Sequence, residues 1–105
     1  MRYAFRMSVH RDAITEYERR HNPIWPELEQ VLIAHGVRSY SIFIDDADGS
    51  LFGFADIANR AQWDAIATTD VCRRWWTFMR DVMPTNADHS PAAQELREVF
   101  CLRVQ

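Results

Sequence analysis

The chain has 105 residues, of which 48% are hydrophobic and 26% charged, and its formal net charge is −3. This length and composition are typical of one folded globular domain over residues 1–105 and exclude a disordered segment. The small negative charge, without a basic stripe, argues against a nucleic-acid partner, and no apolar run approaches the roughly 20 residues of a membrane span.

The N-terminal third predicts a strand and a long, interrupted helix. Apolar and other residues alternate from Tyr3 to Val9, which is the period of a half-buried strand. Asp12 is a suitable N-cap for a helix that runs to about His35 and ends at Gly36. Pro23 removes a backbone donor inside this helix, so the helix should kink or break there.

The middle of the chain predicts a β-hairpin and a short helix. The apolar stretches 37–45 and 50–57 flank DDADG, a turn rich in Asp and Gly, so they should pair as two strands. Asn59 follows them as a suitable cap for a short helix.

The C-terminal part predicts a second helical piece, a loop and a last strand. Thr69 or Asp70 can cap a helix that continues through Met83. The next segment, PTNADHSP, is a loop by its Pro, Asn and Asp content, and residues 96–104 indicate a closing apolar strand.

The order β-α-β-β-α-β predicts an α+β fold of the ferredoxin-like type, an antiparallel sheet with helices on one face. The strand at 50–57 carries Phe52 and Phe54 on one side and Leu51 and Ile57 on the other. A sheet that is apolar on both faces in so short a chain suggests that a second subunit covers one of them. We therefore expect a homodimer.

The compartment is indicated by two features of the sequence. The opening stretch MRYAFRMSV lacks the charged region, apolar run and cleavage site of a secretory signal. Cys72 and Cys101 form no close-spaced motif, and free thiols suit a reducing compartment. We expect a cytoplasmic protein with unpaired cysteines.

His21 is the residue whose surroundings point most directly to chemistry. At about 100° per residue, it shares the inward stripe of the first helix with Tyr17 and Trp25. A lone inward histidine is usually a core residue bonded to a carbonyl. Tyr17 brings a second polar group to the same space, however, and two such groups more often line a pocket. The break at Pro23 is either harmless or frees carbonyls that fix the His21 tautomer.

Three further aromatic residues could complete a pocket. Tyr40 lies on the apolar side of its strand, and its hydroxyl needs a partner, which backbone or a ligand could provide. Trp75 falls at the centre of the apolar face of its helix, which favours packing. Trp76 falls at the rim, where its ring could stack on the C–H face of a sugar.

Other chemistries lack their signatures. The four histidines show no metal-ligand spacing, and three glycines do not make a phosphate-binding loop. The expected pocket is neutral and aromatic, with hydroxyl and imidazole groups, and uses no metal or cofactor. It suits an uncharged polyol better than a nucleotide.

The stretches EYERRHNPIWPELEQVL, TTDVCRRWW, DVMPTNADHSP and ELREVF resemble those of the L-rhamnose mutarotase family over nearly the whole chain. That family has a ferredoxin-like fold, forms homodimers of the dimeric α/β-barrel type, and interconverts the α and β anomers of L-rhamnose without a cofactor. The resemblance implies that His21 is the general acid. It also implies that the sugar is contacted by Tyr17, Tyr40, Trp75 and Trp76.

Some points stay open beside this resemblance. The family reading makes Trp75 a ligand contact, whereas the helical wheel places it in the core. His89 departs from the family pattern in a loop near the expected site. The general base is Tyr17, Tyr40 or a bound water, and the sequence does not choose among them.

Two rival functions share the predicted architecture. Cofactor-free monooxygenases and haem-degrading enzymes of the dimeric α/β-barrel type also use a histidine, an asparagine and a tryptophan in an apolar pocket. His21, Asn22 and the tryptophans could imitate that set. The other rival is a non-catalytic binding module, because this fold hosts many functions.

Overall fold

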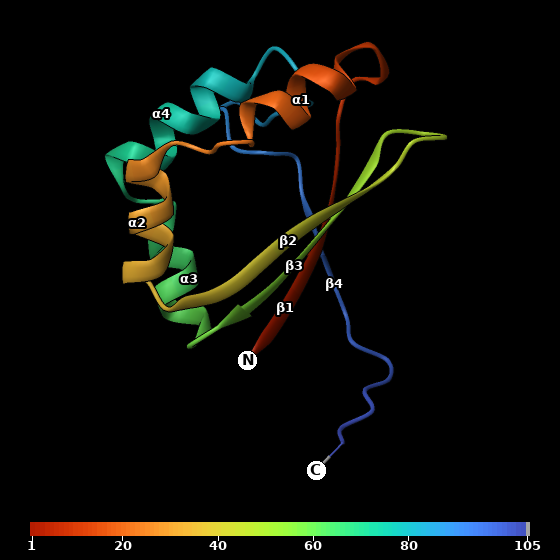
Figure 1. Ribbon diagram of the computed structural model, residues 1–105. Helices are drawn as coiled ribbons and strands as arrows, with labels where there is room; N and C mark the ends of the chain where they lie inside the picture. The colour runs from red at the N-terminus through yellow and green to blue at the C-terminus, as the bar shows by residue number, and fades with distance from the viewer. Residues whose placement is uncertain (105) are drawn as a thin grey trace.

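The computed structural model describes residues 1–104 and shows a four-stranded sheet with its helices packed on one face (Figure 1). The strands have the spatial order β2-β3-β1-β4, and all neighbouring pairs are antiparallel. Their bounds are β1 (Arg2–Ser8), β2 (Val37–Asp45), β3 (Ser50–Ile57) and β4 (Gln94–Leu96). The ferredoxin-like α+β fold predicted from the order of elements is confirmed, as is the central hairpin.

The helical segments lie in the two connections that cross the sheet. They are the 3₁₀ turn η1 (Arg11–Ala13) and the helices α1 (Ile14–Arg20), α2 (Pro26–Ala34), α3 (Arg60–Ile66) and α4 (Asp70–Met79). The Asn59 side chain accepts a hydrogen bond from the Gln62 backbone N–H, and the Thr69 hydroxyl accepts one from the Cys72 N–H. The predicted caps of α3 and α4 are therefore formed, the second by Thr69.

The two faces of the sheet differ in what covers them. The face toward the helices is buried, and its core residues include Phe5, Met7, Leu51, Ala55 and Ile57. The opposite face is bare in the single chain, where Phe43, Phe52 and Phe54 are 65%, 40% and 44% exposed. The prediction from the strand at 50–57 that both sheet faces are apolar is thus confirmed.

Gly53 shapes the buried face at the middle of β3. It lies opposite Phe5 of β1 in the sheet register. A Cβ atom at this position would lie less than 3.0 Å from the Phe5 ring. The missing side chain therefore lets the Phe5 ring lie flat against the sheet, facing the helices.

The first helix differs from its prediction at both its start and its middle. Asp12 does not cap it, because Asp12 lies inside η1 and α1 begins only at Ile14. The predicted interruption is confirmed as a complete break: α1 ends at Arg20 and α2 restarts at Pro26. Pro23 lies between them, where it cannot donate the backbone hydrogen bond that would continue α1.

The C-terminal elements are shorter than predicted. Helix α4 ends at Met79 instead of Met83, and a turn bonded from the Val82 N–H to the Met79 carbonyl follows it. The last strand covers Gln94–Leu96 instead of 96–104.

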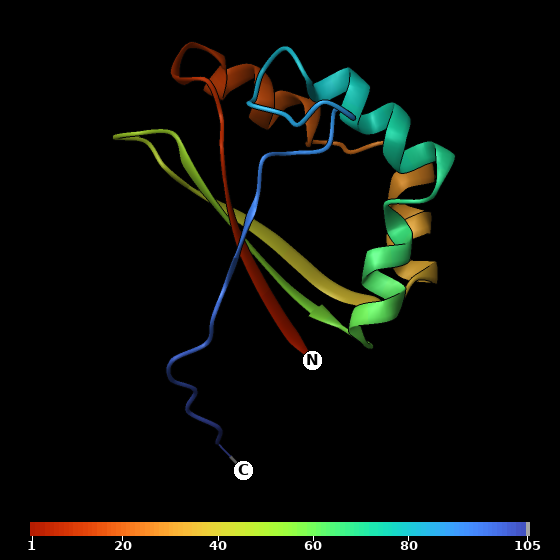
Figure 2. The ribbon, with the colours of Figure 1, turned by 180° about the vertical axis from the view of Figure 1, so that it is seen from behind.

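The reason for the short last strand is the register of the sheet. Because Leu96 already pairs with Ala4 near the start of β1, the chain beyond it soon runs past the end of its partner. Figures 1 and 2 show this segment leaving the sheet beside the N-terminus. Its apolar side chains, which suggested a strand, are exposed in the single chain: Val99, Phe100, Leu102 and Val104.

Candidate active site

A cavity of about 750 Å³ lies between the buried face of the sheet and the helices. It is lined by side chains from β1, β2, β3, every α-helix and the loop after α4. The structure brings together all the residues singled out from the sequence, since the lining includes Tyr17, His21, Tyr40, Trp75 and Trp76.

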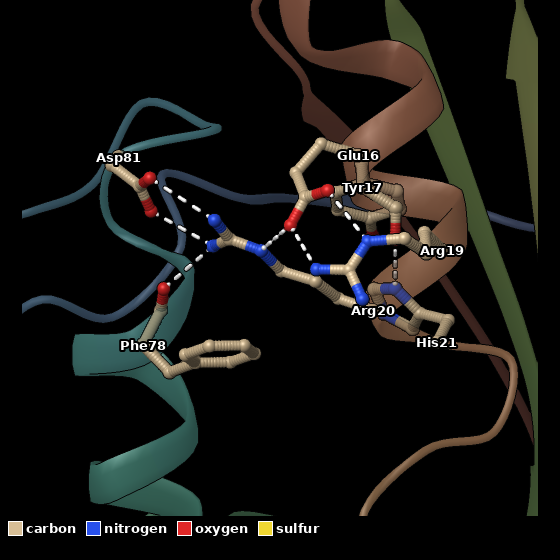
Figure 3. A network of polar contacts seen from close by, with 7 residues as sticks. All are labelled: Glu16, Tyr17, Arg19, Arg20, His21, Phe78 and Asp81. Carbon is tan, nitrogen blue, oxygen red and sulfur yellow. Dashed lines mark hydrogen bonds and ion pairs between the residues drawn. The ribbon is translucent and has the colours of Figure 1, made fainter.

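His21 stands directly after the last turn of α1, and its ring is fixed by a backbone carbonyl. Its Nδ1 lies 2.8 Å from the carbonyl oxygen of Tyr17, one of the last four carbonyls of α1 (Figure 3). A carbonyl only accepts, so Nδ1 donates and carries the proton. The interpretation that the helix break frees a carbonyl to fix the tautomer is consistent with this geometry.

The free nitrogen of His21 determines what the ring can do. With Nδ1 bonded, Nε2 is the atom that exchanges a proton with a ligand. Burial lowers the pKa of His21 below its ordinary value of 6.5, and the hydrogen bond to the Tyr17 carbonyl offsets this only in part. Near neutral pH the ring is therefore mainly uncharged, with Nε2 free to accept a proton.

Tyr17 and Tyr40 present hydroxyl groups without protein partners. Within residues 1–104, no side-chain hydrogen bond is found for either hydroxyl. Because no fully buried side-chain oxygen in the described chain lacks a partner, both hydroxyls keep some exposure to solvent. Burial raises the pKa of both tyrosines far above the ordinary value of 10. Both hydroxyls consequently stay protonated at any ordinary pH and are available as donors or acceptors to a bound molecule.

The adjacent tryptophans of α4 occupy the positions that the helical wheel predicts. Trp75 is only 8% exposed and meets the His21 ring edge to face, with centroids 5.2 Å apart. On its other side it packs against Trp25 at 5.1 Å. Trp76 is half-buried at the rim. Because Trp75 belongs to the core and also lines the cavity, its packing role and its expected ligand contact are compatible.

Sequence reasoning missed part of the cavity wall. Trp63 of α3 lines it, packed against Tyr3 and Tyr40 with centroids 5.2 Å and 5.7 Å apart. The same wheel that placed Trp75 could have identified Trp63 as inward-facing. His89 also reaches the lining, from the loop after α4, and its Nδ1 lies 3.1 Å from the Thr77 hydroxyl.

The described residues contain neither a metal-binding cluster nor a membrane-spanning helix. Over residues 1–104, no three His, Cys, Asp or Glu side chains lie together in an arrangement that could hold a metal ion. In the same part of the chain, no helix has the length and apolar character needed to cross a membrane.

Comparison with known proteins identifies the family. The family model described as L-rhamnose mutarotase matches residues 2–102. The chain belongs to the L-rhamnose mutarotase family. Relatives named L-rhamnose mutarotase from Escherichia coli O1:K1 and Shigella flexneri are each 56% identical over 102 residues, covering 97% of this chain and 98% of the relative.

Solved structures agree with membership of the L-rhamnose mutarotase family. The crystal structure of L-rhamnose mutarotase from Formosa agariphila is 38% identical, with a TM-score of 0.90 over 98% of this chain and 99% of that one. An antibiotic biosynthesis monooxygenase superposes with a TM-score of 0.62 at 15% identity, over 94% of this chain and 98% of the other. That second likeness shows the fold alone. The comparisons thus favour the mutarotase over the monooxygenase reading.

Proposed function

We propose that this protein is an isomerase that interconverts the α and β anomers of L-rhamnose. The observation that carries the proposal is the set of polar groups in the cavity: an imidazole with one free nitrogen and two tyrosine hydroxyls without protein partners. Membership of the L-rhamnose mutarotase family supports the choice of sugar.

Anomer exchange makes simple demands on a site. The ring opens when the ring oxygen gains a proton while the anomeric hydroxyl loses one. Rotation about the C1–C2 bond then presents the other face of the aldehyde, and closure gives the other anomer. The site must supply an acid, a base and room for this rotation, and a cavity of about 750 Å³ is large enough for a monosaccharide.

In our proposal, His21 is the general acid at the ring oxygen. Its Nδ1–H stays on the Tyr17 carbonyl, so protonated Nε2 is the donor and later retakes the proton. One positioned acid or base is typically worth about 10²- to 10⁴-fold in rate. Because mutarotation moves protons without net charge transfer, no cofactor is needed.

The remaining residues would bind and orient the sugar. The hydroxyls of Tyr17 and Tyr40 bond sugar hydroxyls, and the rings of Trp75 and Trp76 meet its C–H groups. The raised pKa of both tyrosines argues against a phenolate base. We assign the base role to a water in the cavity.

We also propose that the active form is a homodimer in the cytoplasm. The bare apolar sheet face, with Phe43 65% exposed, supports a second copy as its cover. Cys72 and Cys101 are both free thiols, which suits a reducing compartment.

Saturation-transfer NMR tests the proposal directly. Exchange between α- and β-L-rhamnose should exceed the buffer rate in proportion to enzyme concentration. Exchange no faster than buffer would refute the mutarotase activity. In that case, a Soret shift on titration with haem would support the haem-degrading alternative.

A further inference from the structure

Arg20 makes the densest set of polar contacts on α1 (Figure 3), and its side chain is not among those that line the cavity. Its guanidinium donates to Glu16 at 2.7 Å and to both carboxylate oxygens of Asp81 at 2.8 and 3.1 Å. It also donates to the Phe78 carbonyl at 2.8 Å. The side chain is only 11% exposed, although it carries a charge. We call these residues the Arg20 network: Glu16, Arg20, Phe78 and Asp81.

The Arg20 network joins two helices that are far apart in the sequence. Glu16 lies one turn earlier on α1, whereas Phe78 is in the last turn of α4 and Asp81 just follows it. The Phe78 carbonyl is one of the last four of α4 and has no intrahelical partner, so Arg20 acts as its cap. A cation there also suits the negative end of the helix dipole.

The guanidinium is held in place by packing as well as by hydrogen bonds. Its central carbon lies 4.5 Å from the centroid of the Phe78 ring. That ring contacts Trp75 at 5.7 Å and Trp25 at 5.3 Å. The contact therefore connects Arg20, through the Phe78 ring, to Trp75, which lines the cavity.

This connection bears on the proton-transferring group because His21 is the next residue. The His21 ring is fixed to α1 by the Tyr17 carbonyl, but its position relative to α4 depends on how the end of α1 is held. We propose that Arg20 is a positioning residue that holds the end of α1 against α4 and thereby sets the His21 imidazole against Trp75. This inference rests on the proposed function, in which His21 transfers the proton.

Arg19 provides a matched control. It pairs with the same Glu16, with its Nη2 2.6 Å from the carboxylate, but it makes no hydrogen bond or ion pair with α4 within the described chain. Its side chain is 69% exposed. A general effect of losing one positive charge from this turn should therefore be the same for both arginines, whereas a positioning effect should belong to Arg20 alone.

The first experiment measures kcat and KM for anomer exchange in the wild type, Arg20→Met, Arg20→Lys and Arg19→Met. A 1 Å misplacement can cost about 10²-fold in rate, so Arg20→Met should lose about 10- to 100-fold in kcat with KM within about threefold. Arg20→Lys keeps the charge and should lose less. Arg19→Met should match the wild type. Equal rates for wild type and Arg20→Met, or equal losses in the two Met variants, would overturn the proposal.

Asp81→Asn serves if Arg20→Met does not fold. It leaves Arg20 bonded to Glu16 and to the Phe78 carbonyl but weakens the tie to the end of α4. We expect a loss of about three- to tenfold in kcat with little change in KM. Wild-type kcat in a folded Asp81→Asn together with an unchanged Arg20→Lys would contradict a positioning role.

The NMR signal of the His21 ring protons tests the positioning role of Arg20 without relying on mutarotase activity. The His21 ring protons lie in the ring currents of Tyr17 and Trp75, whose centroids are 4.4 and 5.2 Å away. The His21 signal, assigned by its loss in His21→Gln, should shift in Arg20→Met and not in Arg19→Met. If wild-type exchange equals buffer, the proposed function fails, and this shift still decides whether Arg20 places the imidazole. An unshifted His21 signal in Arg20→Met would refute the positioning role of Arg20.

Discussion

The two sides of α1 use polar residues in opposite ways. On the outer side, Glu16 and Arg20 are fully paired: each bonds groups of the protein, and the arginine reaches across to α4. On the inner side, the Tyr17 hydroxyl and His21 Nε2 face a cavity without protein partners in the described chain. Buried polar groups normally find partners, so the unpaired side is where a ligand is to be expected.

The contrast between paired and unpaired polar groups is tested most strongly by the two tyrosine hydroxyls in the cavity. Tyr17→Phe and Tyr40→Phe should each reduce kcat/KM about tenfold, and together about a hundredfold, because each removes one hydrogen bond to the sugar. Neither should lower the unfolding midpoint, since no hydrogen bond to protein is found for either hydroxyl in the described chain. Steady-state exchange kinetics and thermal unfolding by circular dichroism check both parts. A clear drop in melting temperature with unchanged kinetics would show that these hydroxyls stabilise the fold and do not bind the sugar.

The two sides should also titrate in different pH ranges. Burial depresses the pKa of His21 below 6.5, so an acid role predicts that exchange above the buffer rate increases by more than about tenfold as pH falls from 8 toward 5, in step with the protonated fraction of His21. The same depressed pKa means that the fold disfavours protonated His21, so stability declines as pH falls below 6.5.

The outer side should respond only in stronger acid. Hydrogen bonds from Arg19 and Arg20 hold the pKa of Glu16 at about 2. The stability from these pairs is present above the ordinary glutamate value of 4.5 and is lost as pH falls from there toward 2. A pH series of exchange rates and melting curves separates the two ranges. Exchange that increases with pH would instead make neutral His21 a base.

The bare apolar face of the sheet, which carries Phe43, is a second surface without a partner in the single chain. Phe43→Glu should convert a dimer to a monomer, because the charge would be buried between two copies. Light scattering after size exclusion should give twice the chain mass of 12.4 kDa for the wild type and the single mass for the variant. A monomeric wild type would remove the homodimer from the account.

The smallest expected effect belongs to His89. Its Nδ1 contacts Thr77, and it reaches the cavity only from the rim loop. His89→Asn should change kcat/KM by less than about threefold in exchange assays. A larger change would show that this loop takes part in binding.

Local patterns were enough to predict most of the fold. The alternation in the strands, the Asp- and Gly-rich turn and the caps at Asn59 and Thr69 are all set by neighbours in the sequence. The predictions were wrong at the start of α1 and the end of α4, and for the last strand, whose length tertiary pairing decides. The last strand stops at Leu96 because β1 offers no partner further on, which no local pattern encodes.

The site was predictable to a similar extent. Helical spacing places Tyr17 and His21 on one inward face, and the strand and helix patterns single out Tyr40 and Trp76. The resemblance to the family adds Trp75 as a ligand contact. Trp63 was missed although the same spacing would have shown it. The network of Arg20 could not be predicted, because its partners Phe78 and Asp81 are about sixty residues away and meet it only through the packing of α1 on α4.

The most direct test of the account is anomer exchange of L-rhamnose by His21→Ala beside the wild type. We expect that exchange above the buffer rate falls by about a hundredfold or more in a variant that keeps the wild-type circular dichroism spectrum. Wild-type exchange rates in His21→Ala would contradict it and assign the proton to another group in the cavity.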